Sequence, residues 1–364
     1  MAQSSLQILV LPGDGIGVEV MQTCLEALRA LERHVGGFRL GFDQHAAGAE
    51  HYRASGIDIS DVTMKAAEKA DAILFGSMGL PDVRRPDGRE IAPQLDLREH
   101  LDLYAGVRPI RSIPGLPSVL ADPRAKDIDF VILREQTEGF FFSRGKPDIR
   151  GDQEAYDTCK ISRPACERLF DYAFRMAARR KARNPRKGRV TCVDKSNVYT
   201  SQAFLNRIFW ERAKNHPDIA ADHAYVDAMA LNLVKKPWEY DVLPMENQFG
   251  DILSDLAGGL VGSMGLAPSG DIGDRHALFQ PAHGTAPDIA GQDKANPTAM
   301  LLSAAMMLDW LGERHHEPKL VEAGQYLERA IDVVFATKKV LPFEFGGRDG
   351  NTAITRAVIA AFSG

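Results

Sequence analysis

The segment 247–255 carries two carboxylates at a spacing that suits a metal ion. Asp251 and Asp255 are four residues apart, so a helix would place them one turn apart on the same face. Two like charges at this spacing repel each other, and a cation such as Mg²⁺ or Mn²⁺, which prefers oxygen ligands, would offset that cost. On this spacing alone an exposed acidic face is the better explanation. Asp227, at the end of a strand-like pattern, provides a third candidate ligand and favours a metal site.

Three arginines and a lysine are candidates for binding and deprotonating an acidic substrate. Arg98 and Arg108 are ten residues apart, and Arg134 follows an apolar run. A guanidinium pairs with a carboxylate through two parallel hydrogen bonds, so converging arginines would bind a dicarboxylate. Each arginine taken alone is equally well explained by a surface charge or a structural ion pair. Lys195 also follows an apolar run, where burial would lower its pKa and make it a general base unless it is an exposed strand end.

Two segments rich in turn residues are candidates for binding a nucleotide. Residues 12–17, Pro-Gly-Asp-Gly-Ile-Gly, form a tight strand-to-helix turn whose amides would approach an anion, but Val18 stands where a dinucleotide fingerprint requires glycine. In the second segment, 283–291, His283 is difficult to explain by core packing. Asn296 and the proline after it predict a helix start, with the helix continuing to residue 311.

The elements that position these residues are those of an α/β fold. Short apolar runs alternate with helical patterns, which predicts mainly parallel strands with crossover helices. The chain has 364 residues, more than one core usually supports, so we expect two domains. The predicted strands are residues 6–11, 72–75, 130–133, 190–193 and 240–243, and the first predicted helix is 16–31.

Two polar segments interrupt this alternation. Residues 143–158 predict a projecting loop or arm. Residues 179–189 are strongly basic and are explained either by nucleic-acid contact or by a solvated helix C-terminus, where cations complement the helix dipole. We favour the second explanation because the chain as a whole is acidic.

Composition indicates a cytoplasmic globular protein that binds neither nucleic acid nor a membrane. The formal net charge is −5, with 45% hydrophobic and 26% charged residues. The first five residues lack the basic and apolar regions of a secretory signal, and no apolar stretch is long enough to span a bilayer. The cysteines do not form metal or disulfide motifs, so we expect reduced thiols at Cys24, Cys159, Cys166 and Cys192.

These motifs, in this order, resemble the metal-dependent β-decarboxylating dehydrogenases, which act on isopropylmalate, homoisocitrate, isocitrate, tartrate or D-malate. The most specific segments are 247–255 and 283–297, and 260–269 looks like the isopropylmalate and homoisocitrate branches. The resemblance implies an isopropylmalate dehydrogenase-like two-domain α/β fold, not a Rossmann fold. Residues 1–104 and 266–364 would form a cofactor-binding domain, and 105–265 a central domain with a dimer interface and an intersubunit arm at about 143–158.

The resemblance also implies a homodimer with shared active sites. It assigns binding of the substrate carboxylates to three arginines, the general base to a lysine of the partner subunit, and Mg²⁺ or Mn²⁺ to three aspartates, one of them also from the partner. In the order of these roles, the residues are Arg98, Arg108 and Arg134; Lys195; and Asp251, Asp255 and Asp227.

The same resemblance assigns NAD binding to the second turn-rich segment. Asp288 matches the acidic position that accepts the ribose hydroxyls, and a carboxylate there would repel the 2′-phosphate of NADP. The residues expected to contact the adenosine half are His283, Gly284, Thr285, Ala286, Pro287, Asp288, Ile289 and Asn296.

This chain departs from the family pattern at positions that affect catalysis and specificity. Phe141 stands where the family has the tyrosine that protonates the enol, and phenylalanine cannot donate a proton. Gln280 replaces a glutamate of the isopropylmalate enzymes. Gln94 and Leu95 replace a pair of leucines, which predicts a substrate pocket of mixed polarity.

The sequence therefore predicts NAD- and metal-dependent oxidative decarboxylation of a 3-substituted malate similar to 3-isopropylmalate. The products would be a 2-oxo acid, CO₂ and NADH. One alternative is a dehydrogenase of the tartrate or D-malate type. Another, suggested by Phe141, is a noncatalytic ligand-binding regulatory paralogue.

Overall fold

The computed structural model describes residues 5–363 and has the predicted α/β fold. The chain forms two compact units. Unit 1 consists of Met1–Leu101, Ile113–Ser118 and Gly262–Gly364, and unit 2 of Asp102–Ser112 and Val119–Val261. No helix within residues 5–363 is long and apolar enough to cross a membrane. The expectation that no secretory signal is present depends partly on residues 1–4, which lie outside the described chain.

The strands of unit 1 lie in the order β2-β1-β3-β12-β11. β1 pairs in parallel with β2 and β3, β12 pairs in parallel with β3, and β11 is antiparallel to β12. All residues of β3, β11 and β12 are buried, as expected for strands covered on both faces. The bounds are β1 (Ser5–Leu11), β2 (Arg39–Gln44), β3 (Ala72–Phe75), β11 (Pro268–Ile272) and β12 (Ala277–Pro281).

Helix α9 (Thr298–His315) is the central helix of unit 1 and packs against β11, β12 and α10. The side-chain oxygen of Asn296 accepts hydrogen bonds from the backbone nitrogen (3.1 Å) and hydroxyl (2.6 Å) of Thr298, which confirms the predicted helix start. The helix continues four residues beyond the predicted end at 311. The other helices are α1 (Ile16–Val35), α2 (Ala49–Ser55), α3 (Asp61–Lys69), α4 (Pro93–His100), α10 (Pro318–Ala336) and α11 (Asn351–Ala360).

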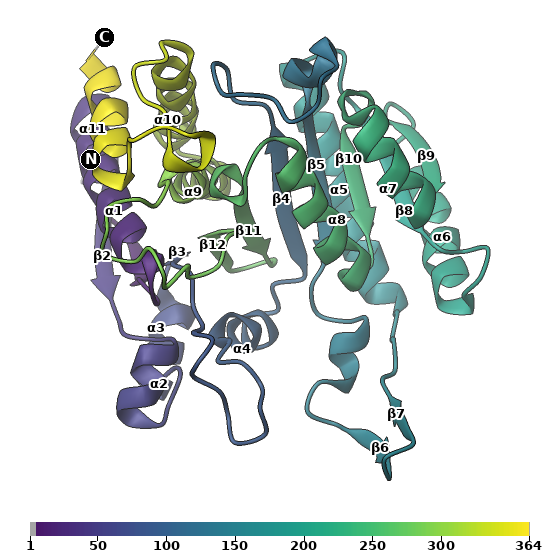
Figure 1. Ribbon diagram of the computed structural model, residues 1–364. Coiled ribbons are helices and arrows are strands. Elements are labelled where there is room, and N and C mark those ends of the chain that lie inside the picture. The colour runs from purple at the N-terminus through teal and green to yellow at the C-terminus, as the bar shows by residue number, and fades with distance from the viewer. Residues whose placement is uncertain (1–4, 364) are drawn as a thin grey trace. The chain divides into compact units, whose positions relative to one another are not determined.

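The strands of unit 2 lie in the order β4-β5-β10-β8-β9, and helices cover both faces (Figure 1). β4 is antiparallel to β5, and the remaining pairs are parallel. The predicted strand 240–243 is wrong at its start, because a 3₁₀ turn (Pro237–Glu239) holds Tyr240 outside β10. The elements are β4 (Ala105–Arg111), β5 (Asp129–Glu135), α5 (Arg163–Arg183), β8 (Arg189–Asp194), α6 (Thr200–Ala213), β9 (Ala220–Tyr225), α7 (Val226–Lys235), β10 (Val242–Met245) and α8 (Asn247–Leu260).

The polar segment 143–158 contains a small antiparallel hairpin, β6 (Asp148–Arg150) and β7 (Glu154–Tyr156). Every residue of the two strands is exposed, and the hairpin extends away from the sheet of unit 2 (Figure 1). Ile149, in the middle of β6 and paired with Ala155, is an apolar side chain that is 67% exposed.

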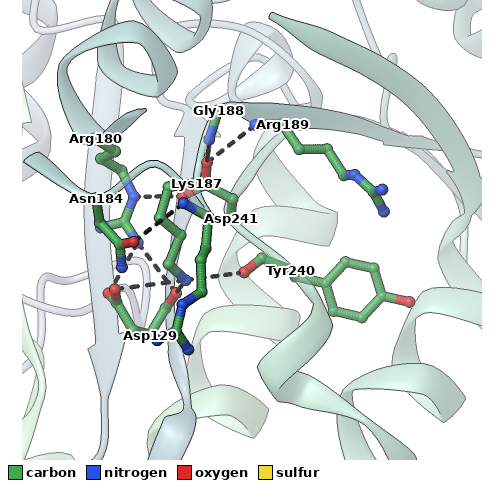
Figure 2. Close-up of polar contacts among 9 residues, drawn as sticks. Asp129, Arg180, Asn184, Lys187, Gly188, Arg189, Tyr240 and Asp241 are labelled. Atoms are coloured by element: carbon green, nitrogen blue, oxygen red, sulfur yellow. Dashed lines mark hydrogen bonds and ion pairs between the residues drawn. The ribbon is translucent and has the colours of Figure 1, made fainter. Parts of the chain in front are cut away.

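The basic segment 179–189 ends a helix as predicted, but two of its cations are not solvated (Figure 2). Arg180 donates to the carboxylates of Asp241 (Nε to Oδ1, 2.5 Å) and Asp129 (Nη2 to Oδ1, 2.8 Å). The Nζ atom of Lys187 lies 3.5 Å from Oδ2 of Asp129. The expectation of a solvated helix end is therefore wrong for these two residues.

Asp241 also fixes the start of β8. Its Oδ2 atom accepts hydrogen bonds from the backbone nitrogens of Gly188 (2.6 Å) and Arg189 (3.1 Å), as Figure 2 shows. Burial raises the pKa of Asp129, but Arg180 and Lys187 outweigh burial and hold that pKa below its usual value. This basic segment thus stabilises the entry to β8, which lies between β10 and β9.

Candidate active site

Helix α8 carries two of the three predicted metal ligands, Asp251 and Asp255, and lies close to β5. Glu246 caps the helix, since its Oε1 atom accepts a hydrogen bond from the backbone nitrogen of Gln248 at 2.6 Å. Glycine at position 250 permits the close packing, because a Cβ atom there would lie 2.6 Å from Cβ of Arg134. The α8 side chains therefore meet the guanidinium of Arg134.

Arg134 is held in one orientation by groups around its guanidinium. Nε and Nη2 donate to Oδ1 of Asn247 at 3.1 and 2.7 Å, and Nη1 donates to the carboxylate of Asp251. The guanidinium carbon lies 5.8 Å from the centre of the Phe141 ring. These groups line a cavity of about 390 Å³, formed by Arg134, Phe140, Phe141, Asp157, Asn247, Gln248 and Asp251.

The acid pair on α8 fits a cation. Burial and the neighbouring carboxylate of Asp251 raise the pKa of Asp255, and Arg108 and Arg134 oppose this shift only in part. In the register of β4 with β5, Gly106 pairs with Arg134, so Arg108 is on the same face of the sheet as Arg134. A divalent cation beside the two carboxylates would relieve their repulsion.

Lys195 and Asp227 form an ion pair of their own, with 2.8 Å between Nζ and Oδ1. This hydrogen bond holds the pKa of Asp227 below its usual value. Asp227 lies in the first turn of α7, which corrects its expected place at a strand end. Residues 5–363 contain no group of three or more acidic, histidine or cysteine side chains that could hold a metal, so Asp227 does not join Asp251 and Asp255 within one chain.

Arg98 lies in unit 1, on α4, and forms a buried ion pair. Its side chain is 7% exposed, and its Nε atom donates to Oδ2 of the fully buried Asp271 at 2.8 Å. Gln280 donates to the same oxygen at 3.0 Å. A glutamate at position 280 would place a second carboxylate against Asp271, a repulsion that the glutamine of this chain avoids. One turn before Arg98, Oε1 of Gln94 is buried without a hydrogen-bond partner.

The predicted cofactor segment contains a buried atom that lacks a partner. His283 lies near Ser77 (Nδ1 to Oγ, 3.2 Å) and its Nδ1 contacts the carbonyl oxygen of Gly284 at 2.9 Å. Burial lowers the pKa of His283, which favours the neutral ring. Because the carbonyl of Gly284 can only accept, its contact with Nδ1 puts the ring proton on that nitrogen. Nε2 is buried without a hydrogen-bond partner and presents a lone pair to a donor, which fits a bound nucleotide.

The glycine-rich turn 12–17, whose amides the sequence predicts to approach an anion, has hydrogen-bond partners within unit 1. The backbone nitrogen of Asp14 donates to the carbonyl of Ser77, and that of Ile16 donates to the carbonyl of Thr285. The carboxylate of Asp14 accepts hydrogen bonds from the backbone nitrogens of Ala49 (2.7 Å), Glu50 (2.9 Å) and Gly79 (2.9 Å). The turn therefore supports the cofactor segment.

Known proteins are similar to this chain in both sequence and fold. Residues 7–360 match the isocitrate/isopropylmalate dehydrogenase family model. The chain belongs to that family. It is 39% identical over 344 residues to a 3-isopropylmalate/3-methylmalate dehydrogenase of Methanocaldococcus jannaschii, covering 94% of each chain. It is 39% identical over 330 residues to a 3-isopropylmalate dehydrogenase of Oceanobacillus iheyensis, covering 89% of this chain and 86% of the relative.

Solved structures of the isocitrate/isopropylmalate dehydrogenase family are also similar. The isocitrate dehydrogenase of Methylococcus capsulatus has a TM-score of 0.85 at 32% identity, covering 99% of this chain and 100% of the other. A β-decarboxylating dehydrogenase of Thermococcus kodakarensis has a TM-score of 0.80 at 34% identity, with 98% and 96% covered. Together, these relationships support a β-decarboxylating dehydrogenase.

The structure groups the predicted site residues of this family member into separate clusters. In unit 2, Arg108, Arg134, Asp251 and Asp255 lie together, and Lys195 lies with Asp227 elsewhere in the unit. Unit 1 holds Arg98, Gln94, Leu95 and the cofactor segment with Asn296, whose Nδ2 atom donates to Glu344 at 2.8 Å. Sequence reasoning missed Asn247 and Asp271, the side chains that orient two of the arginines.

Proposed function

We propose that this chain catalyses NAD- and divalent-metal-dependent oxidative decarboxylation of a 3-substituted malate similar to 3-isopropylmalate, giving a 2-oxo acid, CO₂ and NADH. The observation that carries the proposal is the α8 acid pair beside two buried arginines, Arg108 and Arg134, which are 8% and 5% exposed. A chelating 2-hydroxy acid requires a cation site next to carboxylate-binding groups. The names of the relatives support the same substrate class.

In this proposal the arginines bind and orient the two carboxylates of the substrate. Arg134 has a fixed orientation because Asn247 accepts two of its hydrogen bonds. Its guanidinium therefore loses little conformational freedom when a substrate binds. Asp271 fixes Arg98 in the same way. The cavity beside Phe141 accommodates the remainder of the diacid.

Mg²⁺ or Mn²⁺ would be held by Asp251 and Asp255, with Asp227 of the partner subunit completing the protein ligands. When bound, the metal would polarise the substrate hydroxyl and favour its ionised form. Lys195, oriented by the carboxylate that it contacts at 2.8 Å, would accept the proton from the C2 hydroxyl when its amine is in the neutral form. Phe141 lines the site without donating a proton, so the enol left by loss of CO₂ takes its proton from water.

The cofactor segment 283–289 would bind the adenosine half of NAD, whose nicotinamide accepts the hydride. The unpartnered Nε2 atom of His283 accepts a hydrogen bond from the nucleotide, and the carboxylate of Asp288 disfavours the 2′-phosphate of NADP. The side-chain amide of Asn296 is the remaining proposed contact to the adenosine half.

A homodimer would join the two clusters of unit 2. Helices α7 and α8 pack together and expose Leu231 (59%), Val234 (46%) and Ile252 (60%), an apolar surface suited to a second copy of the same helices. Dimerisation would bring Lys195 and Asp227 of one subunit to Asp251 of the other. Among the described residues of a single chain, Asp227 does not join Asp251.

Phe141 supports a second candidate function, a ligand-binding regulatory subunit without turnover. The substrate test is NADH formation with Mn²⁺ from 3-isopropylmalate, D-malate, tartrate, homoisocitrate and isocitrate, with and without EDTA. We expect EDTA-sensitive turnover of a 3-substituted malate that is lost in Asp255→Asn. Binding of NAD and a diacid with no NADH from any substrate would support the regulatory function instead.

A further inference from the structure

The carboxylate of Asp194, one residue before Lys195, is fully buried and has partners on both oxygens. Oδ1 accepts hydrogen bonds from Nε2 of His223 (2.9 Å) and from the backbone nitrogen of Ser196 (2.8 Å). Oδ2 accepts one from Nδ2 of Asn206 at 2.8 Å. A buried charge is tolerated only when its hydrogen bonds are satisfied, so these partners fix its position.

The hydrogen bond between Asp194 and His223 joins two segments that carry proposed catalytic groups. In the parallel register of β8 with β9, Asp194 pairs with Tyr225. β8 therefore ends just before Lys195, and β9 ends two residues before Asp227. His223 links the end of one strand to the end of the next, beside the Lys195–Asp227 ion pair.

We propose that Asp194 and His223 are positioning residues for Lys195 and Asp227. The proposal rests on the proposed function, in which Lys195 accepts the proton of the substrate hydroxyl. Lys195 has a flexible side chain, so its reach depends on where the backbone holds it. Without the imidazole donor, Asp194 keeps fewer partners and the two strand ends lose a direct connection.

The first test compares His223→Ala with His216→Ala in the full-length protein. The two histidines are well matched: their side chains are 23% and 26% exposed, each lies near a carboxylate, and each contacts an aromatic ring. We expect His223→Ala to lower kcat by roughly ten- to a hundredfold and to change KM by less than about twofold. His223→Gln, which retains an N–H donor, should recover most of kcat. If His223→Ala does not fold, His223→Met removes the donor at similar length.

The second readout does not depend on catalysis. Reductive methylation of Lys195, followed by peptide mass spectrometry, reports how firmly that side chain is held. Lys236, whose Nζ atom lies 2.8 Å from Glu239, is an internal control. We expect faster labelling of Lys195 relative to Lys236 in His223→Ala, with wild-type labelling in His223→Gln.

Unchanged kcat and unchanged Lys195 labelling in a folded His223→Ala variant would overturn the positioning role. Failure of the proposed function has a different signature. Wild-type protein without activity on any diacid, or full activity in Lys195→Ala, would remove the role of the base while the labelling rates still report on its position.

Discussion

Phe141 is the residue that most affects the expected rate. Its ring lies 5.8 Å from the guanidinium carbon of Arg134 and lines the proposed substrate cavity. A tyrosine there would supply a proton donor, and a general acid contributes roughly 10²–10⁴-fold to its step. We therefore expect Phe141→Tyr to raise kcat where enol protonation limits turnover. Phe142→Tyr, at a 42% exposed neighbour, is the control and should change nothing. If kcat of Phe141→Tyr is unchanged on every substrate that the wild type turns over, the proposal that this chain lacks a general acid is contradicted.

Arg98 needs one carboxylate partner, and we expect that this partner can be supplied from either of two positions. Asp271→Asn removes the charge opposite a guanidinium that is 7% exposed, which should cost about 3–5 kcal/mol of unfolding free energy. Gln280→Glu alone should also destabilise, because two buried carboxylates then face each other. The double variant Asp271→Asn/Gln280→Glu should recover much of the loss in urea unfolding. Additive losses in the double variant would contradict the one-carboxylate requirement.

At this scale the sequence predicts residue types well and partners poorly. The spacing of Asp251 and Asp255 is visible in the chain, and the family resemblance exposes Phe141. The orienting partners are not visible, because Asn247 is 113 residues from Arg134 and Asp271 is 173 residues from Arg98. Such pairs exist only after the sheet has formed.

The element scale is best tested at the start of β8, where Asp129 and Asp241 bind the basic end of α5. The folded-state pKa of Asp129 lies below the ordinary 3.8, so its ionised form stabilises the fold above that pH and loses this effect as pH falls through the folded pKa. Asp129→Asn should lower Tm at pH 7, with a deficit that narrows below about pH 3.8. Asp87→Asn, in an exposed pair with Arg89, should have little effect. A deficit that is constant with pH would rule out the ionic contribution.

Strand positions were predicted correctly where burial covers both faces, and less well at their ends. The run 72–75 matches β3 in full, because a strand in the middle of a parallel sheet is apolar throughout. Tyr240 resembles a strand residue in the sequence for another reason: it packs in the core beside a 3₁₀ turn, outside β10. The role of Asp14 is not visible in the sequence, because its carboxylate accepts hydrogen bonds from the backbone nitrogens of Ala49, Glu50 and Gly79, all outside the turn.

At the scale of the whole molecule, the proposal requires each active site to use two subunits. Lys195→Ala and Asp251→Asn should each be inactive as pure homodimers. After the two variants are unfolded and refolded together, we expect about a quarter of the wild-type rate, since half of randomly formed dimers are mixed and each has one intact site. Wild-type protein that is unfolded and refolded in the same way measures how much activity refolding recovers. No activity in the mixture, with mixed dimers present by mass spectrometry, would show that the site is not shared.

The most direct test of oxidative decarboxylation measures NADH and CO₂ in the same reaction, with the best substrate of the panel and Mn²⁺. The account predicts equal amounts of the two products in the wild type and neither product in Asp251→Asn. Formation of NADH without CO₂, or of both products at the wild-type rate in Asp251→Asn, would contradict it.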